Sequence, residues 1–441
     1  MSQASRRHPS AVYLLCLIEG CERFACGALL SLLALYLTEH RQFADSTAIL
    51  IIGGFLACTY LASWPCGWLA DRWLGALGAA RAGAVLTGLG CVALWTDATV
   101  LFWPALGLVA LGQGLFRPAI ITLLSQLYAS DDSRREAGFG LFYISVNLGY
   151  LAGPLFAELA RARSGWPAIF GLATAALLVA SGLLAVCSFP TGQVVDAEHS
   201  ERLVLPHPVE RARLRALCLI TAIAIVFWLA LQQTGTSLPL FAEKRTNLHW
   251  SLLGFSGEAA PGYFATLHGG LVLVLTPLIL WSLARLRALK LSLSTPVQFV
   301  GGLLVTVGAF SLMSAASLYG GNQGRAHIAW LLGCYVLLSI AEVLFSALGT
   351  SFVTKVAPPR FASRMSGIWY ASIAVGQLIA GAMGPLWQHW PQHRYFGCIA
   401  LLCLIAAAVL LVSLGWLDAA LPDSPSNQTQ PKPESDNRAS G

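Results

Sequence analysis

Three charged residues, Glu19, Glu22 and Arg23, lie near the middle of the first long apolar segment, residues 11–37. This segment is long enough to cross a bilayer, and each charge at its centre costs about 2.5–3.5 kcal/mol of insertion free energy. Spacings of three and four residues place the three side chains on one face of a helix. Charges retained at such a cost are typical of a pathway for protons or ionic substrates.

Two more ionisable residues are expected deep in the membrane. Arg117 lies at the depth of the two glutamates, and Glu342 lies almost at the middle of its own span. The five residues carry three negative and two positive formal charges, so one carboxylate lacks a partner. An unpaired carboxylate takes up a proton more readily in a low dielectric than in water. The charges therefore predict exchange of a proton for a substrate charge, with static ion pairs between helices as the alternative.

Composition predicts the elements that position these residues. The 441 residues are 56% hydrophobic and 11% charged, with a mean hydropathy of +0.67, whereas soluble proteins carry about 25% charged residues. We predict an all-α membrane protein with twelve transmembrane helices, and we expect no cleaved signal peptide. The predicted spans are residues 11–37, 46–70, 80–96, 100–128, 136–158, 166–189, 214–241, 263–286, 294–318, 328–354, 364–387 and 395–417.

The spans fall into two halves. Residues 1–190 form the predicted N-terminal six-helix bundle, 191–213 a cytoplasmic linker, 214–420 the C-terminal six-helix bundle and 421–441 a disordered cytoplasmic tail. Of the 27 Lys and Arg residues, 18 lie in one set of loops and 7 in the opposite set. The positive-inside rule then places both termini in the cytoplasm. The protein is expected to be monomeric.

The loop after the second span reads GWLADRWLG, residues 67–75, and contains Gly67, Asp71 and Arg72. This motif is typical of the major facilitator superfamily, in which it serves as a gating loop, and Gly67 is expected to permit a close helix approach. A division into six and six helices with a long central loop is the arrangement of the same superfamily, whose substrate site lies between the halves. Gly149 and Gly153, four residues apart, predict a further helix contact.

Other motifs exclude several classes of protein. There is no Walker A sequence, so the chain is not itself an ATP-driven pump, and there is no His-Glu-x-x-His protease motif. The eleven cysteines all fall within predicted spans and show no metal-type spacing, so we interpret them as small packing residues. We expect a secondary active transporter and not an enzyme, with no cofactor or metal, no nucleic-acid partner and the proton gradient as driving force.

At these residues the sequence resembles the proton-dependent oligopeptide transporter family of the major facilitator superfamily. The family's first helix reads Glu-x-x-Glu-Arg-Phe-x-Tyr-Tyr-Gly-x-Arg, which Glu19, Glu22, Arg23 and Phe24 match. Residues 59–75, 138–155, 227–243 and 339–370 are similar to the family's second, fifth, seventh, and tenth to eleventh spans. The resemblance implies uptake of di- and tripeptides with protons.

The resemblance also assigns roles to residues. It implies proton coupling by Glu19, Glu22 and Arg23. We add Arg117, which lies at their depth and replaces the family's lysine. The residues implied to contact substrate are Tyr60, Asn147 and Glu342, and we expect Gln232, His268 and Trp369 to contact it as well.

The chain departs from the family at several of these positions. The paired tyrosines of the first helix are Cys26 and Gly27, and the arginine and glutamate that pair across the external gate are Leu30 and Gln232. His268 stands where the family reads Ser-Leu-Asn-Pro; we expect it near the outer mouth of the cavity, either titrating near neutral pH or packing as an ordinary histidine.

These observations favour a proton-coupled symporter for short peptides or peptide-like zwitterions in a bacterial inner membrane. Recognition of the substrate's amino group is retained through Glu342 and Asn147, whereas the carboxylate end of the site is remodelled. Two alternatives stay open: a facilitator or exporter of another small metabolite, such as an amino-acid derivative, and a sensor that binds substrate without transport.

Overall fold

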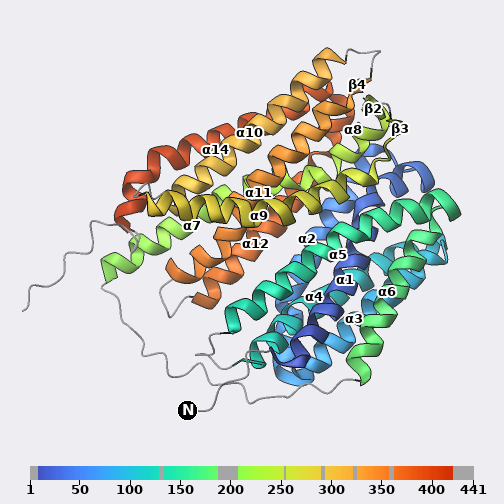
Figure 1. The fold of residues 1–441 in the computed structure, drawn as a ribbon, viewed down its shortest axis with the longest axis horizontal. Helices are drawn as coiled ribbons and strands as arrows, with labels where there is room; N and C mark the ends of the chain where they lie inside the picture. Colours follow the sequence, from blue (N-terminus) through green and yellow to red (C-terminus); the bar gives the residue numbers. More distant parts are fainter. Residues whose placement is uncertain are drawn as a thin grey trace, which may run out of the picture.

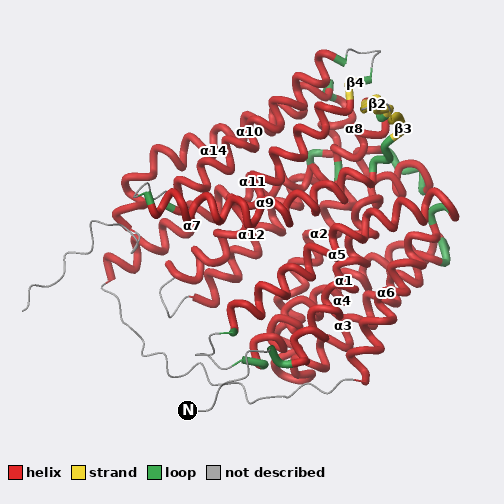
Figure 2. The backbone as a smooth tube through the Cα atoms, viewed as in Figure 1, coloured by secondary structure: helices red, strands yellow, loops and turns green. Residues whose placement is uncertain are grey.

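The computed structural model describes residues 8–128, 134–186, 207–252, 255–289, 294–320, 325–356 and 362–420. Nearly all of them are helical, as Figure 2 shows, and eleven of the described helices are long and apolar enough to cross a membrane. A twelfth helix lies at the position of the eleventh predicted span. The prediction of an all-α membrane protein is therefore confirmed. The tail and most of the predicted linker, residues 191–206, lie outside the described residues.

Six long helices make up the first half of the chain. Two of them continue into short π-helical segments, Tyr36–His40 and Ala70–Leu74, and Thr99–Leu101 is a 3-10 turn. The helices are α1 (Ser10–Leu35), α2 (Asp45–Leu69), α3 (Gly75–Trp95), α4 (Phe102–Gln126), α5 (Arg135–Ser164) and α6 (Pro167–Val186).

The second half contains more and shorter elements than the hydropathy predicts. The predicted seventh span is not one helix, because a 3-10 segment, Gln232–Gly235, separates α7 from α8. The helices are α7 (His207–Leu231), α8 (Ser237–Arg245), α9 (Gly262–Ala288), α10 (Thr295–Tyr319), α11 (Ile328–Val356), α12 (Ala362–Ala382), α13 (Gly384–His389) and α14 (Gln392–Ala420). Four short strands, which were not predicted, are β1 (Thr246–Asn247), β2 (His249–Leu252), β3 (Phe255–Glu258) and β4 (Ala326–His327). β2 and β3 form an antiparallel hairpin, and β1 pairs in parallel with β4.

The helices form two groups, coloured blue to green and light green to red in Figure 1. In the first group α1 packs on α5 and α6, and α3 packs on α4 and α6; in the second, α10 packs on α11 and α14, and α7 on α12. The groups meet where α2 contacts α12 and α13 and where α5 contacts α9. In Figure 1 they lie together at the end that carries β2 and β3 and diverge toward the opposite end.

Glycines set the closest helix approaches. A side-chain carbon on Gly149 would lie 2.7 Å from the Gly20 carbonyl oxygen of α1, and Gly153 lies against the backbone of the same helix, so the predicted contact motif is confirmed. The expectation for Gly67 was wrong, because a side chain there would meet nothing within 4 Å. The segment after Gly67 is also not a loop: it continues α2 as a π-helical segment, in which the Arg72 guanidinium lies over the Trp68 ring. The Asp71 side chain lies outside the described residues.

Polar contacts join the two groups at the end that carries the hairpin, which we call the hairpin end. Asp45 at the start of α2 forms an ion pair with Lys244 of α8 at 2.5 Å and accepts a hydrogen bond from the Trp387 indole at 3.2 Å. Beside them, the Ser46 hydroxyl donates to the Gln388 side chain. Gly53 of α2 and Gly381 of α12 meet backbone to backbone one level deeper. These contacts join the two helix groups at the hairpin end.

Candidate substrate cavity and buried charge cluster

A cavity of about 450 Å³ lies between the two helix groups, within the size range of small-molecule sites. All six residues expected to contact substrate line it, so the structure brings together side chains from α2, α5, α9, α11, α12 and the 3-10 break. The six are Tyr60, Asn147, Gln232, His268, Glu342 and Trp369. Leu30 and Gln232, which replace the family's gate pair, both line the cavity as well.

One wall of the cavity carries an ion pair. His268 Nε2 of α9 lies 2.9 Å from Glu342 Oε2 of α11, and the side chains are 17% and 25% exposed. The other ring nitrogen, Nδ1, lies 2.8 Å from the Ser339 hydroxyl. His268 is thus deeper than expected, in contact with the glutamate at the middle of its span, and it is not an ordinary packing histidine.

Aromatic side chains form the cavity wall of the second helix group. Trp369 is only 2% exposed, and its ring lies nearly parallel to that of Phe345 at 6.3 Å. The Tyr335 ring lies edge-on to His268 at 6.0 Å. Two buried polar atoms here have no hydrogen-bond partner, the Trp228 indole nitrogen and the Gln377 amide oxygen, and both residues line the cavity. The sequence analysis missed both residues, which add an unpaired donor and an unpaired acceptor to the residues that line the cavity.

The charge cluster predicted in α1 is present and buried. Arg23 Nε donates to Glu19 Oε1 at 2.7 Å, and Arg23 Nη2 lies 2.9 Å from Glu22 Oε2. None of the three residues is more than 5% exposed. A single guanidinium therefore balances two carboxylates, which offsets much of the cost of burial but leaves a net negative charge.

Arg117 joins this cluster indirectly. The sequence predicted that Arg117 faces the two glutamates, but among the described residues it forms no ion pair with either. Its Nη2 donates to the Gln113 side-chain oxygen at 2.5 Å, and the Gln113 amide contacts the Cys26 sulfur at 2.8 Å. The Cys26 thiol in turn donates to Glu22 Oε1 at 3.0 Å. Cys26 is therefore more than the packing residue we expected, because it connects the carboxylate to the amide.

Two tyrosines connect the charge cluster with the cavity. The Tyr150 hydroxyl accepts a hydrogen bond from Arg23 Nη1 at 3.2 Å, and the Arg117 guanidinium lies over the Tyr60 ring at 5.2 Å. Both tyrosines line the cavity. Gly27 packs closely against this part of α5, because a side-chain carbon there would lie 3.2 Å from the Pro154 ring and 3.4 Å from the Tyr150 ring. Tyr150 was missed by the sequence analysis, although it lies one helical turn after Asn147 on the same face of α5.

The break between α7 and α8 also faces the cavity, which Gln232, Thr234 and Gly235 line. The fully buried Gln233 side chain supports it: its amide donates to the Leu229 carbonyl at 3.0 Å, and its oxygen accepts from the Ser237 and Tyr395 hydroxyls at 2.7 and 2.8 Å. Irregular backbone at membrane depth is tolerated where it lines a cavity and its polar groups find partners.

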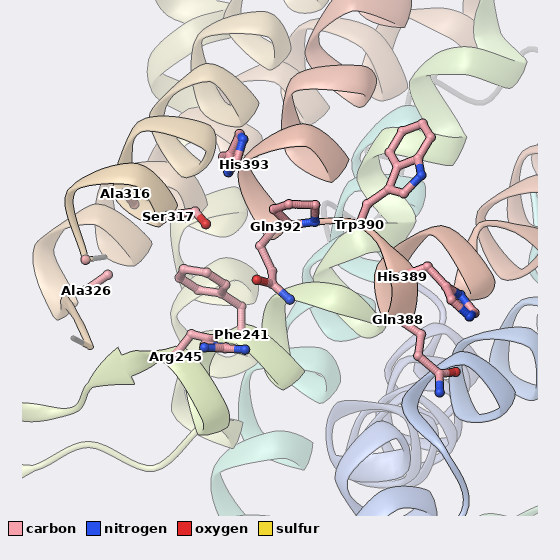
Figure 3. A pocket seen from close by; sticks show the side chains of 12 residues that line it. Phe241, Arg245, Ala316, Ser317, Ala326, Gln388, His389, Trp390, Gln392 and His393 are labelled. Carbon is pink, nitrogen blue, oxygen red and sulfur yellow. The ribbon is translucent and has the colours of Figure 1, made fainter. Parts of the chain in front are cut away.

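A second hollow, of about 350 Å³, lies at the hairpin end of the second helix group (Figure 3). It is lined by the ends of α8, α10 and α13, by the residue of β4 next to them and by the start of α14. In Figure 3 the Gln392 side chain extends toward Arg245 and Phe241. None of the residues that line the central cavity lines this hollow.

The sequence is similar to a known family of transporters and to individual members of it. A model of the POT family matches residues 76–198 and 206–397. The chain belongs to the POT family. It is 28% identical to the peptide transporter YePEPT of Yersinia enterocolitica, over 86% of this chain and 88% of that protein. It is 26% identical to the dipeptide and tripeptide permease A of Salmonella typhimurium, over 86% of this chain and 84% of that protein.

Solved structures of POT transporters share the fold. The peptide transporter POT, as a mutant in complex with alafosfalin, superposes with a TM-score of 0.84 at 24% identity, covering 95% of this chain and 97% of that one. A POT family transporter in complex with 5-aminolevulinic acid gives a TM-score of 0.85 at 22% identity, covering 94% of this chain and 98% of that one. These likenesses confirm the fold of an integral, multi-pass membrane transporter.

Proposed function

We propose that this POT family member is a proton-coupled symporter for di- and tripeptides or peptide-like zwitterions. One observation carries the proposal: a cavity between the helix groups holds a carboxylate, Glu342, on one side, and two tyrosines connect its other side to the buried cluster of Glu19, Glu22, Arg23 and Arg117. The carboxylate receives the substrate's cationic amino group, and the cluster takes up the proton. The names of the relatives, a peptide transporter and a dipeptide and tripeptide permease, support this substrate class.

In this proposal Asn147, Tyr60, Gln232 and Trp369 contact the substrate with His268 and Glu342, and Glu19, Glu22, Arg23 and Arg117 couple it to the proton. The protein works as a monomer in a bacterial inner membrane, with both termini in the cytoplasm. The distribution of Lys and Arg between the loops supports this orientation. The hairpin end is then the outer end. The transporter uses the proton gradient and no cofactor, and it catalyses no chemical reaction.

Uptake of labelled dialanine into proteoliposomes, with and without an inward proton gradient, tests the proposal. Accumulation that depends on the gradient is expected. Transport that is indifferent to the gradient contradicts proton coupling and leaves a facilitator, and binding without any uptake identifies a sensor. Export of substrate is the remaining alternative, and it is favoured by the uncharged Leu30 and Gln232, at which the chain departs from the family. Preloaded vesicles that lose substrate against the substrate gradient would identify export.

A further inference from the structure

The ion pair in the cavity has a defined arrangement of protons. Ser339 has one hydroxyl hydrogen, which it donates to the Tyr335 carbonyl at 2.8 Å. The Ser339 oxygen can therefore only accept from His268 Nδ1, which lies 2.8 Å away. Nδ1 carries a hydrogen for this reason, whatever the charge of the ring.

Because Nδ1 carries a hydrogen, the contact with Glu342 depends on whether Nε2 is also protonated. Without another proton, the lone pair of Nε2 would face a carboxylate lone pair at 2.9 Å, which is a repulsive contact. The short contact therefore requires one proton between Nε2 and Oε2. If the proton is on Nε2, the pair is an imidazolium and a carboxylate; if it is on Oε2, the pair is a neutral imidazole and a carboxylic acid. The pair holds one proton and is neutral overall.

Among the described residues that line the cavity, no group other than this pair charges near neutral pH. The ionisable residues that line the cavity are Tyr60, Tyr150, His268, Tyr335, Glu342 and Tyr370. α9 packs against α5 and α11, which present Tyr150 on one side and Tyr335 with Glu342 on the other, and it also touches α1. A further carboxylate of α5, Glu158, lies against Gly262 at the start of α9 and is paired with Arg161. The guanidinium that reaches Tyr150, that of Arg23 in α1, is also bonded to the carboxylates of its own helix. Among the residues that line the cavity, His268 is thus the group that shares a proton with Glu342.

We propose that His268 holds a proton against Glu342 in the empty transporter, and that the cationic amino group of the substrate displaces this proton when it binds. This inference rests on the proposed function. On binding, the Nε2–H bond breaks and its proton passes to water in the cavity, while the nitrogen keeps the electron pair and accepts an N–H of the ammonium group. Glu342 then accepts another N–H of the same group. The ammonium group thereby replaces the imidazolium as the partner of the carboxylate.

Displacement of the proton by substrate predicts the direction in which the affinity for dialanine changes with pH. Because the proton and the amino group compete for Glu342, the affinity for dialanine falls as pH falls below the midpoint at which the pair gains its proton, by about tenfold per pH unit. The cluster around Glu22 acts in the opposite direction, since symport requires it to take up a proton with substrate. The difference between wild type and a His268 variant separates the two effects.

The test is calorimetry of dialanine binding to the purified full-length protein in buffers of different ionisation enthalpy, between about pH 5.5 and 8. Wild type is expected to release up to about one proton more per bound dialanine than His268→Asn, whose binding loses this part of the pH dependence. His8→Asn serves as the matched control; this histidine lies before α1, bonded to Tyr128 and outside the cavity, and its variant should behave as wild type. Equal proton release in wild type and His268→Asn overturns the inference.

A second measurement needs neither variant nor ligand. Nitrogen NMR of the histidine rings in the empty protein should show that the neutral form of His268 keeps its proton on Nδ1 and that Nε2 is the atom that titrates. A neutral form protonated on Nε2 contradicts the inference even if His268→Asn fails to fold. If wild type does not bind dialanine while the NMR signature is present, the proposed peptide substrate fails and the proton-holding pair stands.

Discussion

At the scale of single residues, the site depends on one carboxylate facing the cavity. Glu342→Gln keeps the shape of the side chain but removes the charge that holds an ammonium group. Removing one partner of a hydrogen-bonded charge pair costs about 2–5 kcal/mol, so the affinity for dialanine should fall by about 30-fold or more, and uptake should be lost. Binding and uptake assays measure this. Glu258→Gln on the exposed hairpin is the matched control; a Glu342→Gln protein that binds as the control does would contradict the role of the carboxylate.

The second prediction at this scale concerns Glu22, whose two oxygens face Arg23 and the Cys26 thiol. Glu22→Gln cannot take up or release a proton, but its one amide oxygen can still accept from Arg23, while its NH2 group replaces the acceptor of the Cys26 thiol. We expect accumulation under a proton gradient to be lost, while exchange of labelled for unlabelled dialanine continues at a rate similar to that of wild type. Counterflow and gradient-driven uptake in the same vesicles distinguish the two activities. Retained gradient-driven accumulation would remove Glu22 from the coupling mechanism.

At the scale of elements, the break between α7 and α8 depends on Gln233. Gln233→Leu would leave the buried Ser237 and Tyr395 hydroxyls without their acceptor, and each unsatisfied group costs about 1–3 kcal/mol. A clear drop in the melting temperature is expected for Gln233→Leu and a smaller one for Tyr395→Phe, which removes a single hydrogen bond. Thermal unfolding in detergent measures both. If Gln233→Leu has the same melting temperature as wild type, the Gln233 side chain does not stabilise the break between α7 and α8.

Hydropathy predicted the long helices, because twenty apolar residues have few other ways to satisfy their backbone in a membrane. It did not predict the break at Gln232–Gly235, since the flanking segments are apolar enough to continue as one span. The site was predictable in part for a similar reason. Span midpoints give the depth of a residue but not its direction around the helix, so Glu22 and Arg117 were placed at one level while the connection through Cys26 and Gln113 stayed hidden.

At the scale of the whole molecule, alternating access requires the hairpin end, where the groups are joined, to open. A charge pair between positions 30 and 232 is absent here, since Leu30 and Gln232 are neutral. Asp45 supplies polar contacts at the same end, because one carboxylate binds both the Lys244 ammonium and the Trp387 indole. Its loss should therefore shift the molecule toward the state that is open at the hairpin end.

Asp45→Ala removes both contacts, whereas Lys244→Met removes only the ion pair, which is worth about 0.2–1 kcal/mol at a partly exposed site. With the indole hydrogen bond added, Asp45→Ala should favour the open state by about 1–2 kcal/mol, or roughly fivefold to thirtyfold. Cross-linking reports this population when Ser46→Cys and Gln388→Cys are introduced, since these side chains touch across the two groups. The cross-linked fraction should fall slightly with Lys244→Met and strongly with Asp45→Ala. Equal cross-linking in all three backgrounds would show that backbone contacts such as Gly53 with Gly381 close this end without help from the charges.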